Sequence, residues 1–460
     1  MKKKVIYLWM LAVGLSSCGH FLDIKPYDKT IPETAEDFSA IIHEMCNEID
    51  NAEANTVGVK YAIEGVDAYT NECYCDNLET NLTEYPIGGM LRTYIGELCS
   101  GSNTYKSIYA TIARSNIVID NLKGDTETQE AKDILGTAYA FRGIGYYQLI
   151  RLFCPPVGSA DEQLGVPLVT EFDMEARPLR STLEQTFAQA ESDMKKAIDY
   201  NVQNELYFFT ADVMKGYLAR LYFWCQHYKE AKELALELLQ RYPLIEGEAY
   251  KAMMTDYNDA VGNMLFRTGK LDKNFATQNT YIAARPISIR YIKLFKEGEK
   301  DIRYNLFIGR LRKNKKVFSC NLRSAELALV AMESACHLGE TEDALSLLND
   351  FRKHRIEDYT PYTMETLPAV DTEDRIQEDA QCKPLTPLLY AILCERRKEM
   401  YMEADRFFEL KRNGRPEFWV TRNGLKYYTR KFMYTFALPA SDIQLNPDLQ
   451  QNPGYTEMEY

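Results

Sequence analysis

The sequence predicts a mostly α-helical protein: a tetratricopeptide-like scaffold of about four helix pairs that carries a loop-rich binding region and a few short strands. Apolar residues recur at three- and four-residue steps over long stretches, which is the spacing of one face of an α-helix. Two stretches also have the helix–turn–helix pattern of a tetratricopeptide repeat. Because a single repeat cannot bury its own apolar face, several repeats must stack on one another.

Two long helices are predicted before residue 200. The first is an amphipathic helix over residues 131–149, and it ends ahead of Pro155-Pro156 because proline cannot continue a helix. The second follows Ser181-Thr-Leu-Glu184, a segment with the form of a capping box. Its expected core face consists of Leu183, Phe187, Ala190, Met194 and Ala197.

Two helical hairpins and a further helix are predicted after residue 210. The first hairpin breaks at Gln226-His227 and ends near Pro243, and the second runs from Ser324 to about residue 355 with its turn at Gly339. The further helix is expected to cover residues 387–411. Asn423-Gly424, which stands between aromatic and β-branched residues, predicts a two-stranded hairpin.

Three less regular segments interrupt the helical pattern, at about residues 50–105, 245–322 and 356–385. The first two are rich in Gly, Asn and Tyr, and the third is acidic and carries prolines. Loops that are held on a rigid scaffold are frequent positions for binding residues. We therefore expect the binding region to lie in these segments of a single large domain, residues 18–460.

The N-terminus has the three parts of a secretion signal. Three lysines, Lys2 to Lys4, precede an apolar run over residues 5–13 that is too short to span a bilayer. Small residues then lead to Cys18, whose thiol can carry a diacylglycerol. We therefore predict a lipoprotein signal peptide over residues 1–17, cleavage before Cys18, and a body held at a membrane by acyl chains.

Charge and composition exclude several classes of function. The formal net charge of −13 becomes −16 when the three signal lysines are removed, so the body is a poor partner for nucleic acid. The chain has five histidines, none at metal-binding spacing from another, and we predict no metal and no cofactor. It also lacks GxSxG, HExxH and a Gly-rich phosphate loop, which favours a binding protein over an enzyme.

The end of the chain carries the most specific motif. Asn446-Pro-Asp-Leu-Gln-Gln-Asn-Pro-Gly-Tyr455 resembles the N-P-x-L-x-Q-N-P-G-Y signature of SusD/RagB outer-membrane nutrient-binding lipoproteins. Asp442, just before it, stands where this family usually has Glu, and Ala404-Asp405 replaces a usual glycine area. Five further segments resemble family motifs in the expected order: Phe21–Pro26, Ala140–Phe153, Asp301–Arg303, Leu322–Leu327 and Glu395–Arg406.

The resemblance covers the chain from Cys18 to Tyr455, and it implies a location and a partner. It implies a lipid-anchored, surface-exposed protein of the outer membrane that forms a lid over a SusC-type TonB-dependent transporter. The usual ligands are oligosaccharides, which the lipoprotein delivers to the transporter, whereas RagB-like members handle peptides. A scaffold that recognises only a protein partner is the remaining alternative.

Candidate ligand-binding residues are tyrosines, whose rings can stack on sugars, together with nearby polar groups that can bond hydroxyls. By resemblance, the first irregular segment holds part of the ligand site in glycan-binding members, and its candidates here are Asp67, Tyr69, Tyr74, Asp76, Tyr85, Arg92 and Tyr94. A second set is Tyr281, Arg290, Tyr291 and Tyr304. Beyond the signal peptide only Trp224 and Trp419 are tryptophans, which keeps peptide binding as the alternative.

The charged motif near residue 400 is interpreted as structural. Arg396, Arg397, Glu399, Asp405 and Arg406 have spacings that allow ion pairs between successive helical turns. The segment from Asn446 to Tyr455 is expected to pack on the body as an extended C-terminal strap.

Overall fold

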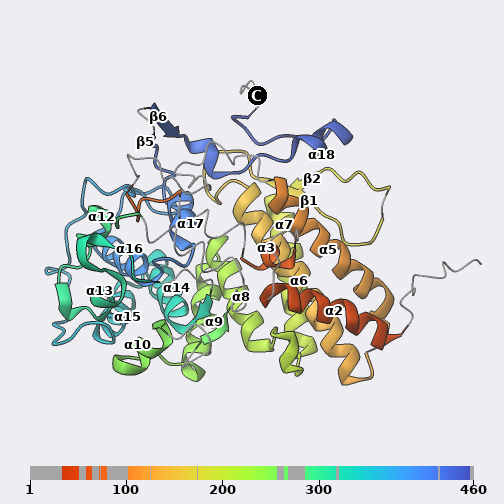
Figure 1. The fold of residues 1–460 in the computed structure, drawn as a ribbon, viewed down its shortest axis with the longest axis horizontal. Helices are drawn as coiled ribbons and strands as arrows, with labels where there is room; N and C mark the ends of the chain where they lie inside the picture. The colour runs from red at the N-terminus through yellow and green to blue at the C-terminus, as the bar shows by residue number, and fades with distance from the viewer. Residues whose placement is uncertain are drawn as a thin grey trace, which may run out of the picture.

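The structure is a computed structural model. It describes residues 34–50, 58–64, 72, 74–79, 102–124, 126–173, 175–255, 264–267, 285–316, 321–422 and 425–455. Helices dominate, as predicted, and the strands form three two-stranded antiparallel ribbons. In Figure 1 the helices from α2 to α7 lie on the right, those from α9 to α17 lie on the left, and α8 lies between them.

The right-hand part is built around α6 (Gln129–Phe153), which is buried along almost its whole length. The predicted helix and its end before the two prolines are confirmed, but the prediction of an amphipathic helix is wrong. Neighbours cover α6 on several sides, so even Asp133, Arg142 and Gln148 are buried. These neighbours are α2 (Ala35–Asp50), α3 (Val59–Glu64), α5 (Ser102–Leu122) and α7 (Leu183–Tyr200).

The capping box of α7 lies one residue later than predicted. Thr182 is the N-cap: its Oγ1 accepts from the N–H of Gln185, whose side chain accepts from the Thr182 N–H. Ser181 instead donates its hydroxyl to the carbonyl of Val166 at 2.8 Å. This bond joins the ribbon formed by β1 (Leu164–Pro167) and β2 (Arg180–Thr182), so Ser181 belongs to a strand.

Both predicted helical hairpins are confirmed. The first pairs α8 (Ala211–Trp224) with α9 (Tyr228–Arg241), and the chain reverses at Gln226 with φ 64°. The second pairs α14 (Ser324–His337) with α15 (Thr341–Lys353), and Gly339 at its turn has φ 79°. Because α14 packs against both α8 and α9, the two hairpins form one stack.

The single helix predicted over residues 387–411 is wrong, because the chain forms two helices, α16 (Pro387–Glu399) and α17 (Asp405–Arg412). Between them Met402 and Ala404 have φ 59° and 60°, values that end a right-handed helix. The break places the Glu403 carboxylate in the interior, where Arg323 donates to it at 2.9 and 3.0 Å. Long-range charge pairing has therefore overridden the helical pattern.

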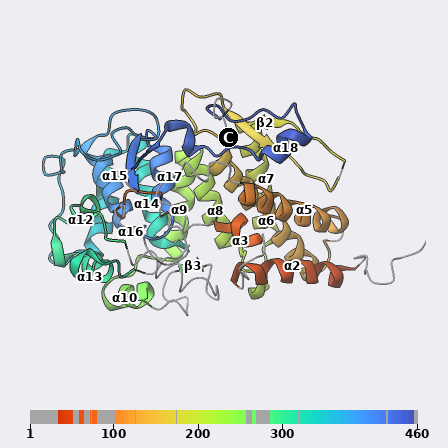
Figure 2. The same cartoon turned by 45° about the horizontal axis from the view of Figure 1, so that its top comes forward.

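The irregular segment after α9 contains short elements that form a second apolar cluster around Tyr291, Phe295, Phe307 and Tyr401. Figure 2 places α10, α12 and α13 together on this side of the molecule. The elements of this cluster are α10 (Gly247–Thr255), α12 (Ile289–Ile292) and α13 (Ile302–Phe307), whereas β3 (Met264–Arg267) and β4 (Asn321–Arg323) pack into the main core through Phe266 and Leu322.

The C-terminal part closes over the top of the molecule in Figure 1. It contains β5 (Phe418–Arg422), β6 (Leu425–Thr429) and α18 (Ala440–Leu445). The predicted hairpin is confirmed, with Trp419 paired to Tyr428. The C-terminal strap is confirmed as well: Asn452 donates to the carbonyls of Phe153 and Phe436 at 3.0 and 2.6 Å.

Candidate functional site

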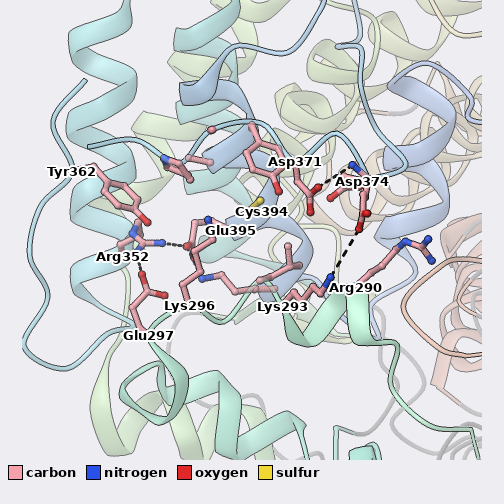
Figure 3. A pocket seen from close by; sticks show the side chains of 17 residues that line it. Arg290, Lys293, Lys296, Glu297, Arg352, Tyr362, Asp371, Asp374, Cys394 and Glu395 are labelled. Carbon is pink, nitrogen blue, oxygen red and sulfur yellow. Dashed lines mark hydrogen bonds and ion pairs between the residues drawn. The ribbon is translucent and has the colours of Figure 1, made fainter. Parts of the chain in front are cut away.

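A cavity of about 210 Å³ lies between α12, the acidic segment after α15, and α16 (Figure 3). The predicted residue Arg290 lies on its wall. The other side chains come from segments far apart in the sequence, and together they combine aromatic rings with charges of both signs. They are Lys293, Leu294, Lys296, Glu297, Arg352, Tyr362, Pro368, Ala369, Asp371, Glu373, Asp374, Tyr390, Ala391, Cys394, Glu395 and Lys398.

Local helix signals position two of these walls. Pro387 occupies the first turn of α16, and the Thr386 hydroxyl caps the helix by accepting from the N–H of Leu389 at 3.2 Å. Ser288 caps α12 in the same way, accepting from the N–H of Tyr291 at 3.1 Å. The single turn of α12 leaves Arg290 exposed on the cavity wall while Tyr291 is buried.

The floor of the cavity is a buried set of ion pairs. Glu395 receives Lys398 at 2.7 Å and Arg303 at 2.6 Å. Arg352 bridges Glu395 to Glu297, as the dashed lines of Figure 3 show. Burial by itself would raise the pKa of Glu395, but these cations hold it below its ordinary value. The floor therefore consists of ionised side chains that are paired with one another.

Two tyrosines supply the aromatic surface. Tyr362 is half-buried, and the Arg352 guanidinium lies 4.3 Å from its ring centroid. Burial raises the pKa of Tyr362 to about 12, so its hydroxyl remains a hydrogen-bond donor at neutral pH. Tyr390 is almost fully buried and forms part of the wall from α16.

The rim carries exposed charges of both signs. Arg290, Lys293 and Lys296 are exposed on the α12 side. Across from them Asp371 and Glu373 are exposed, and Lys293 lies 4.0 Å from Glu373 in a solvent-exposed pair that contributes little to stability. Such side chains can bond hydroxyl, carboxylate or amine groups of a ligand.

The lining is suited to binding rather than to covalent chemistry. Burial raises the pKa of the Cys394 thiol to about 12, which leaves it protonated and weakly nucleophilic. Glu395 is held ionised by its cations, so it is a poor proton donor. Within the described part of the chain, no group of three or more His, Cys, Asp or Glu side chains is placed to hold a metal ion.

Among the sequence candidates that fall within the described residues, Arg290 alone lines this cavity. Tyr304 is a half-buried residue of α13, and its ring packs edge-on against Phe295 with 5.6 Å between the ring centroids. Tyr291 is fully buried and donates its hydroxyl to the Lys398 carbonyl at 3.2 Å. Both contacts are with the protein interior.

Tyr74 and Asp76 are also interior residues. Tyr74 is 2% exposed, and the Asp76 carboxylate forms ion pairs with Arg406 and Arg397. Neither side chain carries part of the binding proposal below. The other predicted residues lie outside the described ones: Cys18, Asp67, Tyr69, Tyr85, Arg92, Tyr94 and Tyr281.

Sequence reasoning missed Lys293, Tyr362, Asp371 and Tyr390. Tyr362 and Asp371 belong to the third irregular segment, which is acidic and contains prolines. This composition is the only sequence signal that points to these two residues as binding residues. Tyr390 lies within a helical pattern, where an aromatic residue is usually core. Nothing in the sequence shows that these positions meet α12.

The interpretation of the charged motif as structural agrees with the burial of its residues, but the expected local pairing is wrong for most of them. Arg396 pairs with Asp405, nine positions away, at 2.6 Å. Glu399 receives Arg303, Arg323 and Arg355 at 3.3, 2.6 and 3.0 Å. Because these partners come from other elements, the motif joins distant parts of the fold.

Two family models match the sequence. The model described as "Starch-binding associating with outer membrane" matches residues 20–223, and the model described as "SusD family" matches residues 310–455. Together the two models cover most of this chain, which has a helical-repeat fold. The chain belongs to the SusD/RagB family. Among curated protein sequences, none matches this chain significantly.

Solved structures share the fold. A SusD superfamily protein from Bacteroides thetaiotaomicron has a TM-score of 0.69 at 22% identity, covering 91% of this chain and 100% of its own. A putative sugar binding protein from Bacteroides vulgatus has a TM-score of 0.69 at 20% identity, with coverage of 93% and 100%. A SusD-like carbohydrate binding protein from the same species has 0.68 at 18%, with 91% and 98%.

Proposed function

We propose that this protein is a surface lipoprotein that binds an oligosaccharide or polysaccharide and delivers it to a SusC-type TonB-dependent transporter of the outer membrane. Family membership supports the general role, and so do similar folds described as sugar or carbohydrate binding. The observation that carries the ligand class is the cavity between α12 and α16, which brings tyrosine rings next to groups that bond hydroxyls.

The proposed contacts follow from the chemistry of a sugar. A pyranose has an apolar face that stacks on an aromatic ring and an equatorial belt of hydroxyls. The half-buried Tyr362 ring would take the apolar face, while Arg290 and Asp371 would donate to and accept from the hydroxyls. A floor that is held by buried ion pairs would keep its shape when the ligand enters.

Peptide binding, as in RagB-like proteins, is the second candidate. A specific observation favours it: the rim carries both cations and carboxylates, which would also match the termini and side chains of a short peptide. The described tryptophans do not line the cavity either, because Trp224 is buried in α8 and Trp419 lies on β5.

The anchor is part of the proposal. Cleavage of residues 1–17 would leave Cys18 at the N-terminus, and acylation there would hold the protein at the outer membrane, facing outward. Within the described residues, every helix is either too short or too polar to cross a membrane.

Binding to a glycan array and to a peptide library tests the ligand class. We expect the purified protein to bind a set of related glycans, and Tyr362→Ala to weaken that binding by about tenfold, a loss of about 1.4 kcal/mol. Phe172→Ala is the matched control, because Phe172 is an aromatic residue that is 49% exposed and does not line the cavity. Peptide binding without glycan binding would favour the second candidate. Binding to neither the glycan array nor the peptide library would favour a scaffold that recognises a protein partner.

Delivery to a transporter is tested separately. We expect affinity purification of the tagged lipoprotein from outer membranes to recover a TonB-dependent barrel protein, and its gene to lie beside that of the lipoprotein. Recovery of the lipoprotein without any barrel, under conditions that retain other outer-membrane complexes, would contradict this part of the proposal.

A further inference from the structure

The β5–β6 hairpin exposes two aromatic side chains next to each other. Trp419 and Tyr428 are directly paired across the antiparallel strands, and they are 47% and 46% exposed. Directly opposite side chains in such a pair have Cβ atoms about 5 Å apart. The hairpin stands at the top of the molecule in Figure 1, above α12 and α13. Neither Trp419 nor Tyr428 lines the cavity, so the two rings form a small aromatic surface of their own.

The other face of the hairpin is fixed to the body, so this surface has a defined position. Phe418 and Thr429 are 7% and 1% exposed. The Arg375 guanidinium covers the Phe418 ring at 4.5 Å from its centroid. The Lys431 N–H, just after β6, donates to the Glu417 carboxylate at 3.2 Å.

Each exposed ring has a cation beside it. The Lys426 ammonium lies 4.3 Å from the Trp419 ring centroid, and the Arg430 guanidinium lies 5.0 Å from that of Tyr428. Among the residues that the structure describes, no carboxylate forms an ion pair with Lys426, Arg430 or Lys431. Together with the exposed Glu417 just before β5, these cations leave a locally positive surface on a chain whose net charge is −13.

A hollow of about 360 Å³ continues from the base of the hairpin. Arg430 and Lys431 line it, and it extends to Asn452 of the C-terminal strap. Its wall also carries Asp161, Glu162, Arg415 and Glu417, and Asp161 pairs with Arg415. The lining therefore carries charges of both signs, with Arg430 at the end nearest the aromatic pair, and a chain-like ligand could follow the surface from the rings into the hollow.

We propose that the face formed by Trp419, Lys426, Tyr428 and Arg430 is a second binding surface, for an acidic polysaccharide that carries carboxylate or sulfate groups. The apolar faces of consecutive sugars would stack on the two rings. Their acidic groups would then lie beside the two cations, which gain favourable electrostatic energy in the complex. This surface does not depend on the ligand of the cavity.

The charges favour this occupant over others. A neutral glycan would use the rings but not the cations. A stable protein partner needs about 800 Å² on each side, far more than two half-exposed rings and their neighbours provide. A membrane-inserting hairpin would present aliphatic side chains to the lipid, whereas the two side chains that accompany the rings here are Lys426 and Arg430.

Affinity electrophoresis of the full-length lipoprotein tests the proposal, with sodium polygalacturonate and chondroitin sulfate as acidic probes and dextran as the neutral one. We expect retention by at least one acidic probe that weakens as salt is added. Both Trp419→Ala/Tyr428→Ala and Lys426→Gln/Arg430→Gln should lower the affinity about tenfold, and the second pair should also reduce the salt dependence. Phe172→Ala and Lys300→Gln are the matched exposed controls.

The alternatives give different results. An unchanged affinity in both hairpin variants, or no retention of wild type by either acidic probe, would overturn the proposal. Equal loss in Tyr362→Ala would place the acidic ligand in the cavity instead and overturn it too. Binding to phosphatidylglycerol vesicles that needs the hairpin, without polysaccharide binding, would assign the surface to the membrane. Far-ultraviolet circular dichroism of each variant distinguishes misfolding from a loss of binding, and Tyr428→Ser serves as a milder variant.

Discussion

Arg406 and Asp76 form a two-point ion pair across 330 positions of sequence: Nε lies 2.8 Å from Oδ1 and the second guanidinium nitrogen 3.1 Å from Oδ2. Both side chains are buried, and Arg397 also reaches Asp76 at 3.1 Å. Burial would raise the pKa of Asp76, but the two guanidinium groups hold it well below its usual range. The pair joins the first irregular segment to the start of α17.

Asp76→Asn should destabilise the protein by about 3–5 kcal/mol, because it leaves two buried arginines without their main carboxylate. Urea unfolding followed by circular dichroism measures this. The control is Asp358→Asn, which removes an exposed partner of Lys300 at 3.4 Å and should cost less than about 1 kcal/mol. Equal stability losses in the two variants would show that the buried ion pair contributes no more to the free energy of unfolding than the exposed one.

Glu333 should make the stability depend on acid pH. Burial raises its pKa, but Arg412, which lies 2.6 Å away, lowers it to about 2 overall. The ordinary pKa of this group is about 4.5, so its contribution is complete above about pH 5 and is lost as the pH falls toward 2. The contribution at neutral pH is about 3 kcal/mol by this linkage.

The matched measurement for Glu333 compares wild type with Glu333→Gln in urea at a series of pH values. The stability difference should be largest near neutrality and should shrink between about pH 4.5 and pH 2. A difference that stays constant over this range would mean that the carboxylate does not stay ionised in the folded protein down to such low pH.

Ala404 has a left-handed backbone, with φ 60° and ψ 12°. This conformation costs a non-glycine residue about 1–2 kcal/mol, and replacing Ala404 by glycine removes that cost. The gain is offset because glycine has a larger chain entropy in the unfolded state and lacks the buried methyl group. Ala404→Gly should therefore leave the free energy of unfolding within about 0.5 kcal/mol of wild type or raise it. Ala252→Gly, at an exposed position in α10, should cost about 1 kcal/mol in the same assay.

Cys18→Ala should abolish labelling with radioactive palmitate and release the protein from membranes, because the variant lacks the thiol that carries the acyl chains. Cys382→Ala is the control, since Cys382 is an exposed cysteine far from the signal and its loss should leave labelling intact. Persistent labelling of Cys18→Ala would refute the proposed anchor.

The helical scaffold could be predicted because its signals are local. The α8–α9 and α14–α15 hairpins follow from apolar spacing and from turn residues such as Gly339. The capping box was displaced by one residue because Ser181 and Thr182 are chemically equivalent caps, and only the pairing of β1 with β2 decides between them.

The cavity and the break after α16 could not be predicted because they depend on contacts across the sequence. Glu403 leaves the helical path to meet Arg323, 80 positions earlier. Tyr362 reaches the cavity through a loop whose sequence has an acidic, proline-containing composition but no motif that indicates where the loop packs. Arg290 is a sequence candidate because it stands beside tyrosines, and it lies on the cavity wall, whereas the neighbouring candidate Tyr291 is buried.

The bond between Asp76 and Arg406 also limits how the protein can be redesigned or can diverge. An exchanged first segment must bring a carboxylate to the same place, or Arg397 and Arg406 will lose a close buried partner and keep only Asp374 and, for Arg406, Glu409. Likewise, a chain shortened before α17 would leave Asp76 without its two-point partner. The first irregular segment can thus change freely only at positions that leave this connection intact, so the segment around Asp76 and the start of α17 are constrained to evolve together.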